Sequence, residues 1–282
     1  MRYICAIDPG NKESAYVLAD NNLRPVSFVK IENELMWDHM IEALCQLEAD
    51  AEVLFAIEMI ASYGMAVGAE VFDTCRWIGR MEERLKKQLD FALEIDKEKN
   101  IFRQTHLSGH GRNENDAEHA WHMAIMAWLL REYANEEVDV AKVMLMCLIH
   151  DIVEIDTGDT YAYDEENLKT QKAREDAAKE RIFSLLPENQ KEELIALFDE
   201  FEAYETAEAK FAHSLDNLQP LLLNNSNDGG DWREHRVTAD AVYGRQRKTR
   251  IGSEKLFEVT DQIIRDHIQK GNIRASSAEK EK

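Results

Sequence analysis

The pattern of apolar residues changes once along this 282-residue chain, near residue 86, and that change limits the folds open to it. Before it, β-rich runs alternate with helical spacing, which predicts strands at 2–8, 14–20, 26–32 and 53–60 and helices at 34–48 and 69–89. After it, strand patterns stop and the periodic segments are spaced as helices. We therefore predict an α+β protein, in which a small α/β module precedes an all-α bundle.

The predicted bundle is read from helical spacing at 86–98, 116–135, 138–156, 168–186, 188–203, 206–224, 238–246 and 253–269. Only four prolines occur in the whole sequence, which suits a largely helical second half. The polar segments 108–115 and 225–231 are predicted to be loops. The predicted organisation is a module at 1–85, a helical domain at 86–274 and a flexible tail at 275–282.

Acidic residues outnumber basic ones, with 55 Asp+Glu against 34 Lys+Arg, so the formal net charge is −21. A hydrophobic content of 44% is enough to build cores, which separates this acidity from that of a disordered chain. Nucleic-acid affinity comes largely from Lys and Arg that replace counterions. The charge therefore disfavours a nucleic-acid partner.

The four cysteines, at positions 5, 45, 75 and 147, have no metal-binding or redox spacing. We interpret them as buried free thiols in a reducing compartment. The first residues do not match a signal peptide, and no apolar run approaches the roughly 18 residues that a membrane span needs. A cytoplasmic protein without a membrane partner is the expectation.

Ionisable residues occupy three places in the helical half where apolar residues are expected. His119 shares a helical stripe with methionines and leucine, and His150 and Asp151 interrupt an apolar run, with Glu154 close behind them. Asp216 lies among the leucines of another helix, where an unpaired carboxylate is costly to bury. One interpretation is that each is a core residue satisfied by ordinary hydrogen bonds.

A single divalent cation explains all three places together. Two imidazoles and two carboxylates form a nitrogen and oxygen ligand set that suits Mn, Co, Zn, Fe or Mg, and the set does not decide among them. The cation would also cancel buried negative charge, lower the pKa of water and polarise a phosphoryl oxygen. We therefore predict one bound metal ion.

These residues lie in the motifs ENDAEHAWH, LIHDIVEIDTGDT and ETAEAKFAHSLDNLQPLL, preceded by IFRQT. In that order the motifs resemble the HD-domain metal-dependent phosphohydrolases, in particular the 5′-deoxynucleotidase-like branch, over about 86–274. The resemblance implies that the metal ligands are His119, His150, Asp151 and Asp216. It further implies that Glu154 and Asp159 position water and substrate and that Arg103 contacts phosphate.

The activity implied by this resemblance is removal of phosphate from nucleoside 5′-monophosphates or related small phosphomonoesters, in a protein that can form a homodimer. The fork of an arginine suits the oxygens of a phosphate. An alternative from another class is a nucleotide-binding protein without turnover.

The N-terminal module carries two candidate residues of its own. Asp8 in AIDPGNKESAYVL and Glu58 in FAIEMIASYGMAVG each end a predicted strand. Over 1–85 the sequence resembles the front half of RuvC-type resolvases of the RNase H-like fold, which implies a structure-selective DNA endonuclease. The later strand and acidic helix of those nucleases are absent, and two-metal cleavage needs the complete set of carboxylates. Asp8 and Glu58 are therefore interpreted as a vestigial site, and the alternative is that they bind one metal ion weakly with help from a partner chain.

Overall fold

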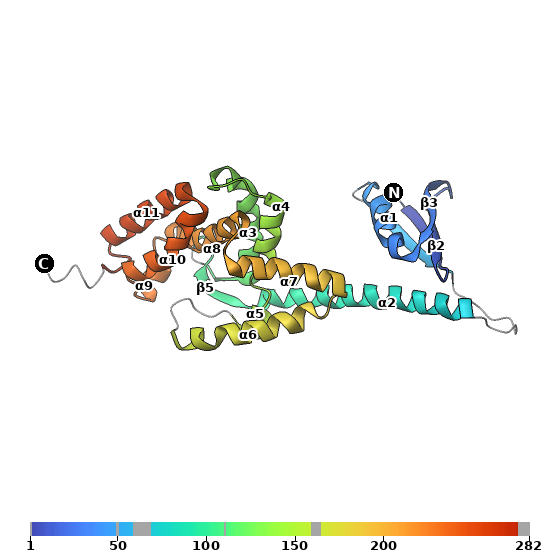
Figure 1. The fold of residues 1–282 in the computed structure, drawn as a ribbon. Coiled ribbons are helices and arrows are strands. Elements are labelled where there is room, and N and C mark those ends of the chain that lie inside the picture. The colour runs from blue at the N-terminus through green and yellow to red at the C-terminus, as the bar shows by residue number, and fades with distance from the viewer. Residues whose placement is uncertain (1, 49–50, 59–68, 110, 159–164, 276–282) are drawn as a thin grey trace. The chain divides into compact units, whose positions relative to one another are not determined.

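The computed structural model describes residues 2–48, 51–58, 69–109, 111–158 and 165–275 (Figure 1). The chain divides into two compact units, Met1–Lys86 and Lys87–Lys282. Each unit has its own hydrophobic core. Among the described residues, every helix is too short or too polar to cross a bilayer.

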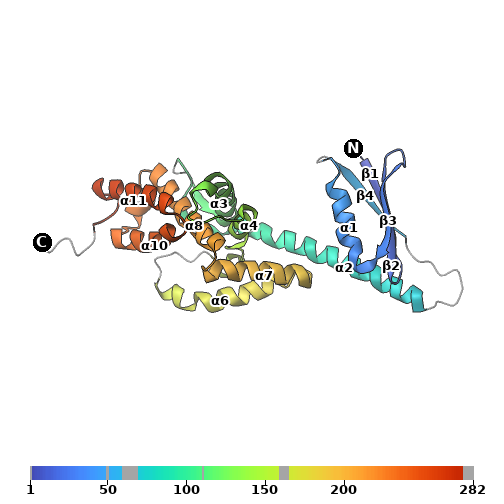
Figure 2. The same ribbon diagram turned by 45° about the horizontal axis from the view of Figure 1, so that its top comes forward.

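The N-terminal unit is a four-stranded mixed sheet with a helix on one face. It contains β1 (Arg2–Asp8), β2 (Glu13–Asp20), β3 (Pro25–Glu32), α1 (Asn33–Cys45), β4 (Glu52–Ile57) and the first part of α2 (Ala69–Ile95). The strand order is β3-β2-β1-β4, in which β4 pairs parallel to β1 and the other neighbours are antiparallel (Figure 2). The meander expected of the first three strands is therefore present.

Alternation along the strands gives this sheet one covered face. Cys5, Tyr16 and Leu18 are buried and pack with Met36 and Met40 of α1. The alternate positions point to the other face, whose large apolar side chains are exposed at Val17, Val26, Phe28 and Leu54. The sheet of the N-terminal unit therefore has one covered face and one open face with exposed apolar side chains.

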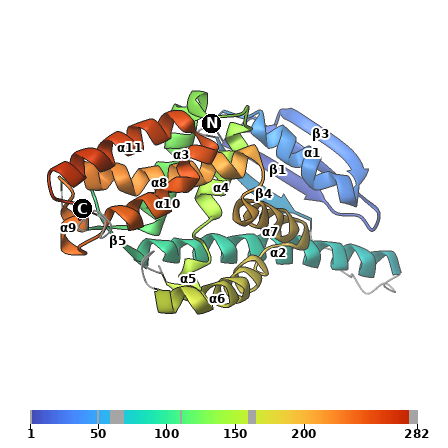
Figure 3. The same cartoon turned by 60° about the vertical axis from the view of Figure 1, so that its left-hand side comes forward.

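The second unit is a helical bundle that holds a short two-stranded ribbon. Its elements are η1 (Asp96–Asn100), β5 (Phe102–His106), β6 (Asn113–Asn115), α3 (Asp116–Leu130), η2 (Arg131–Tyr133), α4 (Val140–Ile149), α5 (Glu154–Thr157), α6 (Glu165–Phe183), α7 (Glu188–Ala203), α8 (Ala207–Ser226), α9 (Gly230–Glu234), α10 (Ala239–Gly252) and α11 (Glu254–Gln269). The central helix is α8, which packs against α3, α4, α7, α10 and α11 (Figure 3).

The centre of α8 is unusual because Pro220 lies inside it. Proline has no backbone N–H, so Pro220 cannot donate the usual helical bond to the carbonyl of residue 216, four positions earlier. Side chains bond the neighbouring carbonyls: Gln246 Nε2 donates to the carbonyl of Asn217 at 2.8 Å, and Asn224 Nδ2 donates to that of Pro220 at 3.1 Å. Polar side chains thus support α8 next to a candidate site residue.

The structure corrects several sequence predictions. The statement that strand patterns stop near residue 86 is wrong, because β5, between the predicted helix at 86–98 and the predicted loop at 108–115, pairs with β6 inside that loop segment. The predicted helix at 138–156 is interrupted: α4 ends at Ile149, a turn follows, and α5 is a separate short helix. The predicted loop at 225–231 is partly helical, since α8 extends to Ser226 and α9 begins at Gly230.

The interpretation of all four cysteines as buried is also wrong. Cys5 and Cys147 are buried, whereas Cys45 and Cys75 are exposed, and all four are free thiols. Cys45 ends α1 on a side of that helix that does not face the sheet, so an apolar sequence context did not guarantee burial. The free state of the thiols agrees with the prediction.

Candidate metal centre

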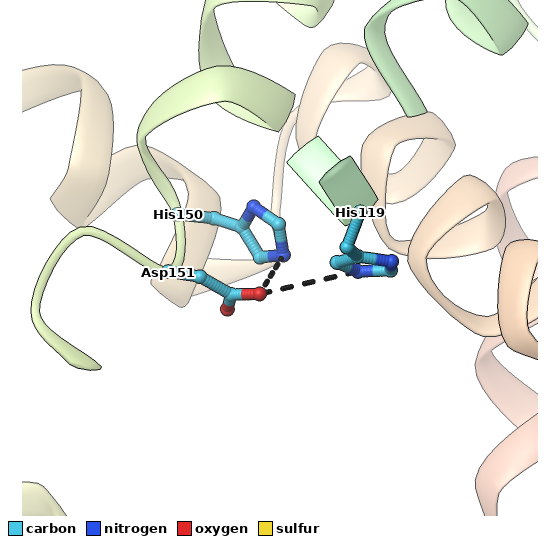
Figure 4. A group of neighbouring side chains, drawn as sticks. All are labelled: His119, His150 and Asp151. Atoms are coloured by element: carbon cyan, nitrogen blue, oxygen red, sulfur yellow. Dashed lines mark ion pairs between the residues drawn. The ribbon is translucent and has the colours of Figure 1, made fainter. Parts of the chain in front are cut away.

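Three helices of the helical unit, and the turn that follows one of them, carry the predicted ligands. His119 projects from α3, His150 and Asp151 lie at the end of α4 and in the turn that follows it, and Asp216 projects from α8. Figure 4 shows the first three side chains pointing toward one another. Each of these three offers a ligand atom within 4.8 Å of the other two.

The distances define a small cluster of nitrogen and oxygen atoms. Oδ2 of Asp151 lies 3.1 Å from His150 Nε2 and 3.9 Å from His119 Nε2. Oδ1 of Asp216 lies 3.3 Å from the same His119 nitrogen. Three of the four residues expected from the sequence therefore form one group, and Asp216 contacts that group through His119, which lies 97 positions earlier in the chain.

Hydrogen bonds on the far side of each imidazole fix its tautomer. His119 Nδ1 donates to Oε1 of Gln219 at 2.9 Å, and Gln219 is oriented by its own donation to Glu114 at 2.6 Å. His150 Nδ1 donates to the backbone carbonyl of Cys147 at 2.9 Å. In each neutral ring the lone pair is then on Nε2, the atom that faces the carboxylates.

This arrangement fits a divalent cation. Two lone pairs that face carboxylate oxygens at these distances repel unless a positive charge lies between them. Within the described part of the chain, His150 Nε2 makes no hydrogen bond. Neutral imidazoles and carboxylates are suitable ligands for the transition metals predicted from the sequence.

Burial and charge set the protonation of the cluster. Burial lowers the pKa of His119 to about 4. Burial also acts to lower the pKa of His150, but the Asp151 carboxylate outweighs it and raises that pKa to about 9. Burial favours the neutral form of Asp151 and of Asp216, yet adjacent histidine and arginine groups hold both pKa values below the usual range. Without metal, the proton of His150 supplies the central positive charge.

Arg103 enters the site from β5. Its Nη1 donates to Asp151 Oδ2 at 2.8 Å and to Asp116 Oδ1 at 3.3 Å. Glu154 lies on the same side, because one carboxylate oxygen from each of Asp116, Asp151 and Glu154 lies within 4.8 Å of the other two. A buried guanidinium thus sits between the metal cluster and a second carboxylate pair.

Sequence reasoning missed the acidic shell around this arginine. Glu114 lies 3.7 Å from His119 Nδ1, and burial raises its pKa to about 7. Burial raises the pKa of Glu98 to about 8, helped by the charges of Asp151 and Asp116. The available signal for Glu114 was the dense polar run at 113–118, which was assigned to a loop and to the start of a helix.

One sequence candidate cannot be placed, and two further histidines lie near the cluster without joining it. Asp159 lies outside the described residues. His213 stacks on Phe201, with ring centroids 4.0 Å apart, and its Nε2 bonds the Phe201 carbonyl, which is a structural role. His122 approaches Gln219 Nε2 at 3.1 Å and so lies behind the cluster.

The two N-terminal candidates lie together, at the ends of neighbouring parallel strands. Ile7 pairs with Ile57, and the backbone N–H of Glu58 donates to the carbonyl of Ile7 at 2.9 Å. Asp8 and Glu58 both line one open pocket on the exposed face of the sheet. This placement is compatible with the vestigial interpretation, which stays a prediction.

Comparison with known proteins identifies the helical unit. Residues 95–257 match the model of a family described as HD domain. A solved structure, described as a predicted metal-dependent phosphohydrolase from Magnetospirillum magnetotacticum MS-1, is 47% identical with a TM-score of 0.65, and the match covers 68% of this chain and 96% of that one.

Curated relatives match a shorter region. The human 5′-deoxynucleotidase HDDC2 is 32% identical over 111 residues, which are 39% of this chain and 53% of the human protein. The Xenopus laevis 5′-deoxynucleotidase HDDC2 is 32% identical over 122 residues, 43% of this chain and 57% of that protein. The chain therefore spans about half the length of the curated relatives it matches.

Fold and site together define a largely helical domain built around a cluster of histidine and aspartate that can hold a metal ion. More particularly, the chain belongs to the HD-domain family. The resemblance read from the helical half of the sequence is thereby confirmed, whereas the RuvC-like resemblance of the N-terminal module is not.

Proposed function

We propose that this protein is a metal-dependent phosphohydrolase that removes phosphate from nucleoside 5′-monophosphates or related small phosphomonoesters. The observation that carries the proposal is the cluster itself: two imidazoles with fixed tautomers and the Asp151 carboxylate offer ligand atoms within 4.8 Å of one another, with Asp216 in contact with His119 and a buried arginine beside them. The names of the curated relatives support the nucleotide as substrate class.

We infer that His119, His150, Asp151 and Asp216 hold one divalent cation. Such an ion polarises a phosphoryl oxygen and lowers the pKa of water near it. The protein side chains bind and orient the substrate and transfer protons. Metal analysis of the purified protein identifies the ion.

Arg103 is proposed to bind the non-bridging oxygens of the phosphate. Its guanidinium already points at Asp151, so a phosphate that reaches the cluster meets a fixed donor. Glu154, with its carboxylate beside Asp151, is proposed to accept the proton of the attacking water as the new P–O bond forms and to return it to the departing 5′ oxygen, so that phosphate and nucleoside leave. Asp159 is proposed, from the sequence alone, to position water or substrate as the ester P–O bond breaks.

The test is release of inorganic phosphate from a panel of nucleoside 5′-monophosphates with Mn, Co, Zn or Mg. His150→Ala and Asp151→Asn should each reduce kcat/KM at least about a hundredfold, because loss of a ligand costs more than loss of a group that orients one. Asp199→Asn, an exposed aspartate on α7, is the matched control and should leave turnover unchanged. Phosphate release that survives both site variants contradicts the proposal.

The same panel separates the alternative functions. Nucleotide binding without phosphate release would favour a binding protein without turnover. The nuclease alternative is not favoured, because the family match lies in the helical unit and the chain is strongly acidic. The four free thiols support a reducing compartment such as the cytoplasm.

We also infer that the protein forms a homodimer. Trp121, Ile125, Trp128 and Leu129 are exposed at helical spacing on one face of α3. Exposed apolar stripes of this kind are typical of protein interfaces, and the commonest soluble assembly is a dimer with two-fold symmetry.

A further inference from the structure

Two arginines reach the metal cluster, and the protein holds them differently. The side chain of Arg103 is 10% exposed, and its Nη1 donates to Asp151 at 2.8 Å. Arg245 of α10 is 30% exposed and has longer contacts: Nε donates to Asn217 Oδ1 at 3.3 Å, and Nη2 lies 3.8 Å from Asp216 Oδ1. Arg103 is therefore committed to the protein, whereas the outer N–H groups of Arg245 can turn toward a ligand.

The charges around the two arginines differ in the same way. Arg103 lies against Asp116 and Asp151, so two carboxylates offset its charge. In the part of the chain that the structure describes, Arg245 lies within 4 Å of one carboxylate, that of Asp216. A cation at the ligand cluster would share this carboxylate with Arg245, and the two positive groups would repel each other. An anion that contacts both of them removes the repulsion.

The exposed side of the cluster is the side of Arg245. Among the four predicted ligands, Asp216 has the most exposed side chain, at 20%, whereas His119 and His150 are buried. A phosphate that arrives from solvent therefore meets Asp216 and Arg245 before it meets the imidazoles.

Helix α10 places Arg245 firmly against α8. Gln246, the next residue, donates to the carbonyl of Asn217 at 2.8 Å. At Gly252 the two helices approach so closely that a Cβ would lie 2.1 Å from the carbonyl oxygen of Lys210. The backbone of Arg245 is thus fixed beside the cluster, as a substrate contact requires.

We propose that Arg245 binds substrate, with its guanidinium in contact with non-bridging oxygens of the phosphate. The assignment rests on the proposed phosphohydrolase function and adds a second phosphate contact to that of Arg103. A planar fork of N–H groups matches two phosphate oxygens, which the ammonium of a lysine does not. Because Arg245 contacts the phosphate alone, its loss affects all phosphomonoesters alike.

The first test measures phosphate binding without turnover. Inorganic phosphate is titrated calorimetrically into the full-length, Mn²⁺-loaded protein. Arg245→Met should weaken binding about tenfold to a hundredfold, the effect of losing one hydrogen bond between charged groups. Arg247→Met, at an exposed position of the same helix, removes the same charge and should leave binding unchanged. Equal phosphate affinity of Arg245→Met and wild type, or no phosphate binding by wild type, overturns the assignment.

The affinity for Mn²⁺ separates a phosphate contact from a structural role. If Arg245 only oriented Asp216, its loss would weaken binding of the metal. We expect Arg245→Met to bind Mn²⁺ at least as tightly as wild type, because a competing positive charge beside Asp216 is removed. Arg245→Lys retains the charge without the fork, so its phosphate affinity should lie between those of Arg245→Met and wild type. Weaker Mn²⁺ binding by Arg245→Met overturns the assignment.

Turnover keeps this inference distinct from the proposed function. In a protein that releases phosphate, Arg245→Met should lower kcat/KM by the same factor for a deoxynucleoside 5′-monophosphate and for p-nitrophenyl phosphate. A loss confined to the nucleotide overturns the assignment. If wild type hydrolyses neither ester, the proposed function fails, and the titration with inorganic phosphate alone decides the role of Arg245.

Discussion

Gln219 sets the metal-binding form of His119. Its carbonyl oxygen accepts the Nδ1 proton of the ring, and its amide nitrogen is held by Glu114. A histidine ligand whose other nitrogen is fixed in this way keeps its lone pair directed at the metal. The cluster is thus defined as much by the residues behind the ligands as by the ligands themselves.

Gln219→Leu should weaken binding of the metal by about tenfold to a hundredfold, because His119 loses the acceptor that fixes its tautomer. Calorimetric titration with Mn²⁺ measures the change. Gln262→Leu, on the exposed side of α11, serves as the control. Unchanged affinity in the Gln219 variant would show that the ring is oriented by other contacts.

His150 makes metal binding dependent on pH. Its pKa of about 9 means that the ring is protonated at pH 7 when no metal is bound, and a ligand must lose that proton. Affinity should therefore fall as pH falls from 9 to 7, by about tenfold per unit, with about one proton released at pH 7. His119 has a pKa of about 4, so it contributes no pH dependence to metal affinity between pH 7 and pH 9.

Mn²⁺ titrations at pH 7 in buffers of different ionisation enthalpy measure the released proton. The observed heat should vary with the buffer in wild type. His150→Asn offers an oxygen ligand without a proton, so its heat should not vary. Equal heats in all buffers for wild type would contradict protonation of His150 in the metal-free protein.

At the scale of elements, the long helices could be predicted from the sequence. The irregular segments that carry site residues could not. The spacing that predicted α7 at 188–203 matches the structure, and α3 begins at Asp116 as its capping sequence indicates. The end of α4 was missed because Ile152, Val153 and Ile155 continue the helical spacing of apolar residues beyond Ile149. Tertiary contacts of His150 and Asp151 override that local pattern.

The ribbon of β5 and β6 was missed for a related reason. Its strands are short and polar, so they lack the alternation that identifies a strand. The two strands form because Arg103 and Glu114 are buried against the cluster. That burial depends on residues far away in the sequence, so a short stretch of sequence does not reveal it. The predicted ligands were found from the sequence because they interrupt stripes of apolar residues. Asp116 and Gln219 were not found, because neither stood out as a break in such a stripe.

The start of α3 supplies a stability prediction. Asn115 accepts from the backbone N–H of Glu118 at 2.9 Å, and Glu118 accepts from that of Asn115 at 3.2 Å. Asn115→Ala should lower the free energy of unfolding by about 1 kcal/mol, measured by urea denaturation. Asn115→Ser retains a capping oxygen and should recover most of the loss. Equal stability of the alanine variant and wild type would rule out a role for this cap.

At the scale of the whole molecule, the apolar face of α3 predicts self-association. Light scattering should give a mass about twice the 32.6 kDa of one chain. Replacing both Trp121 and Trp128 with Glu should give the single-chain mass, because like charges would meet across the interface. Val259→Glu, an exposed apolar residue of α11, is the control and should leave the assembly intact. A wild-type protein with the single-chain mass would exclude the dimer.

The open face of the N-terminal sheet ties colloidal behaviour to the acidic composition. The exposed apolar surface formed by Val17, Phe28 and Leu54 favours self-association. At low ionic strength the net charge of −21 keeps copies of the protein apart. At 0.1 M salt that repulsion is screened beyond about 10 Å, whereas the attraction between apolar surfaces is not. The negative charge therefore keeps the protein soluble by repulsion between copies. Added salt screens that repulsion, and we expect the apolar face of the N-terminal sheet to be the first surface to associate.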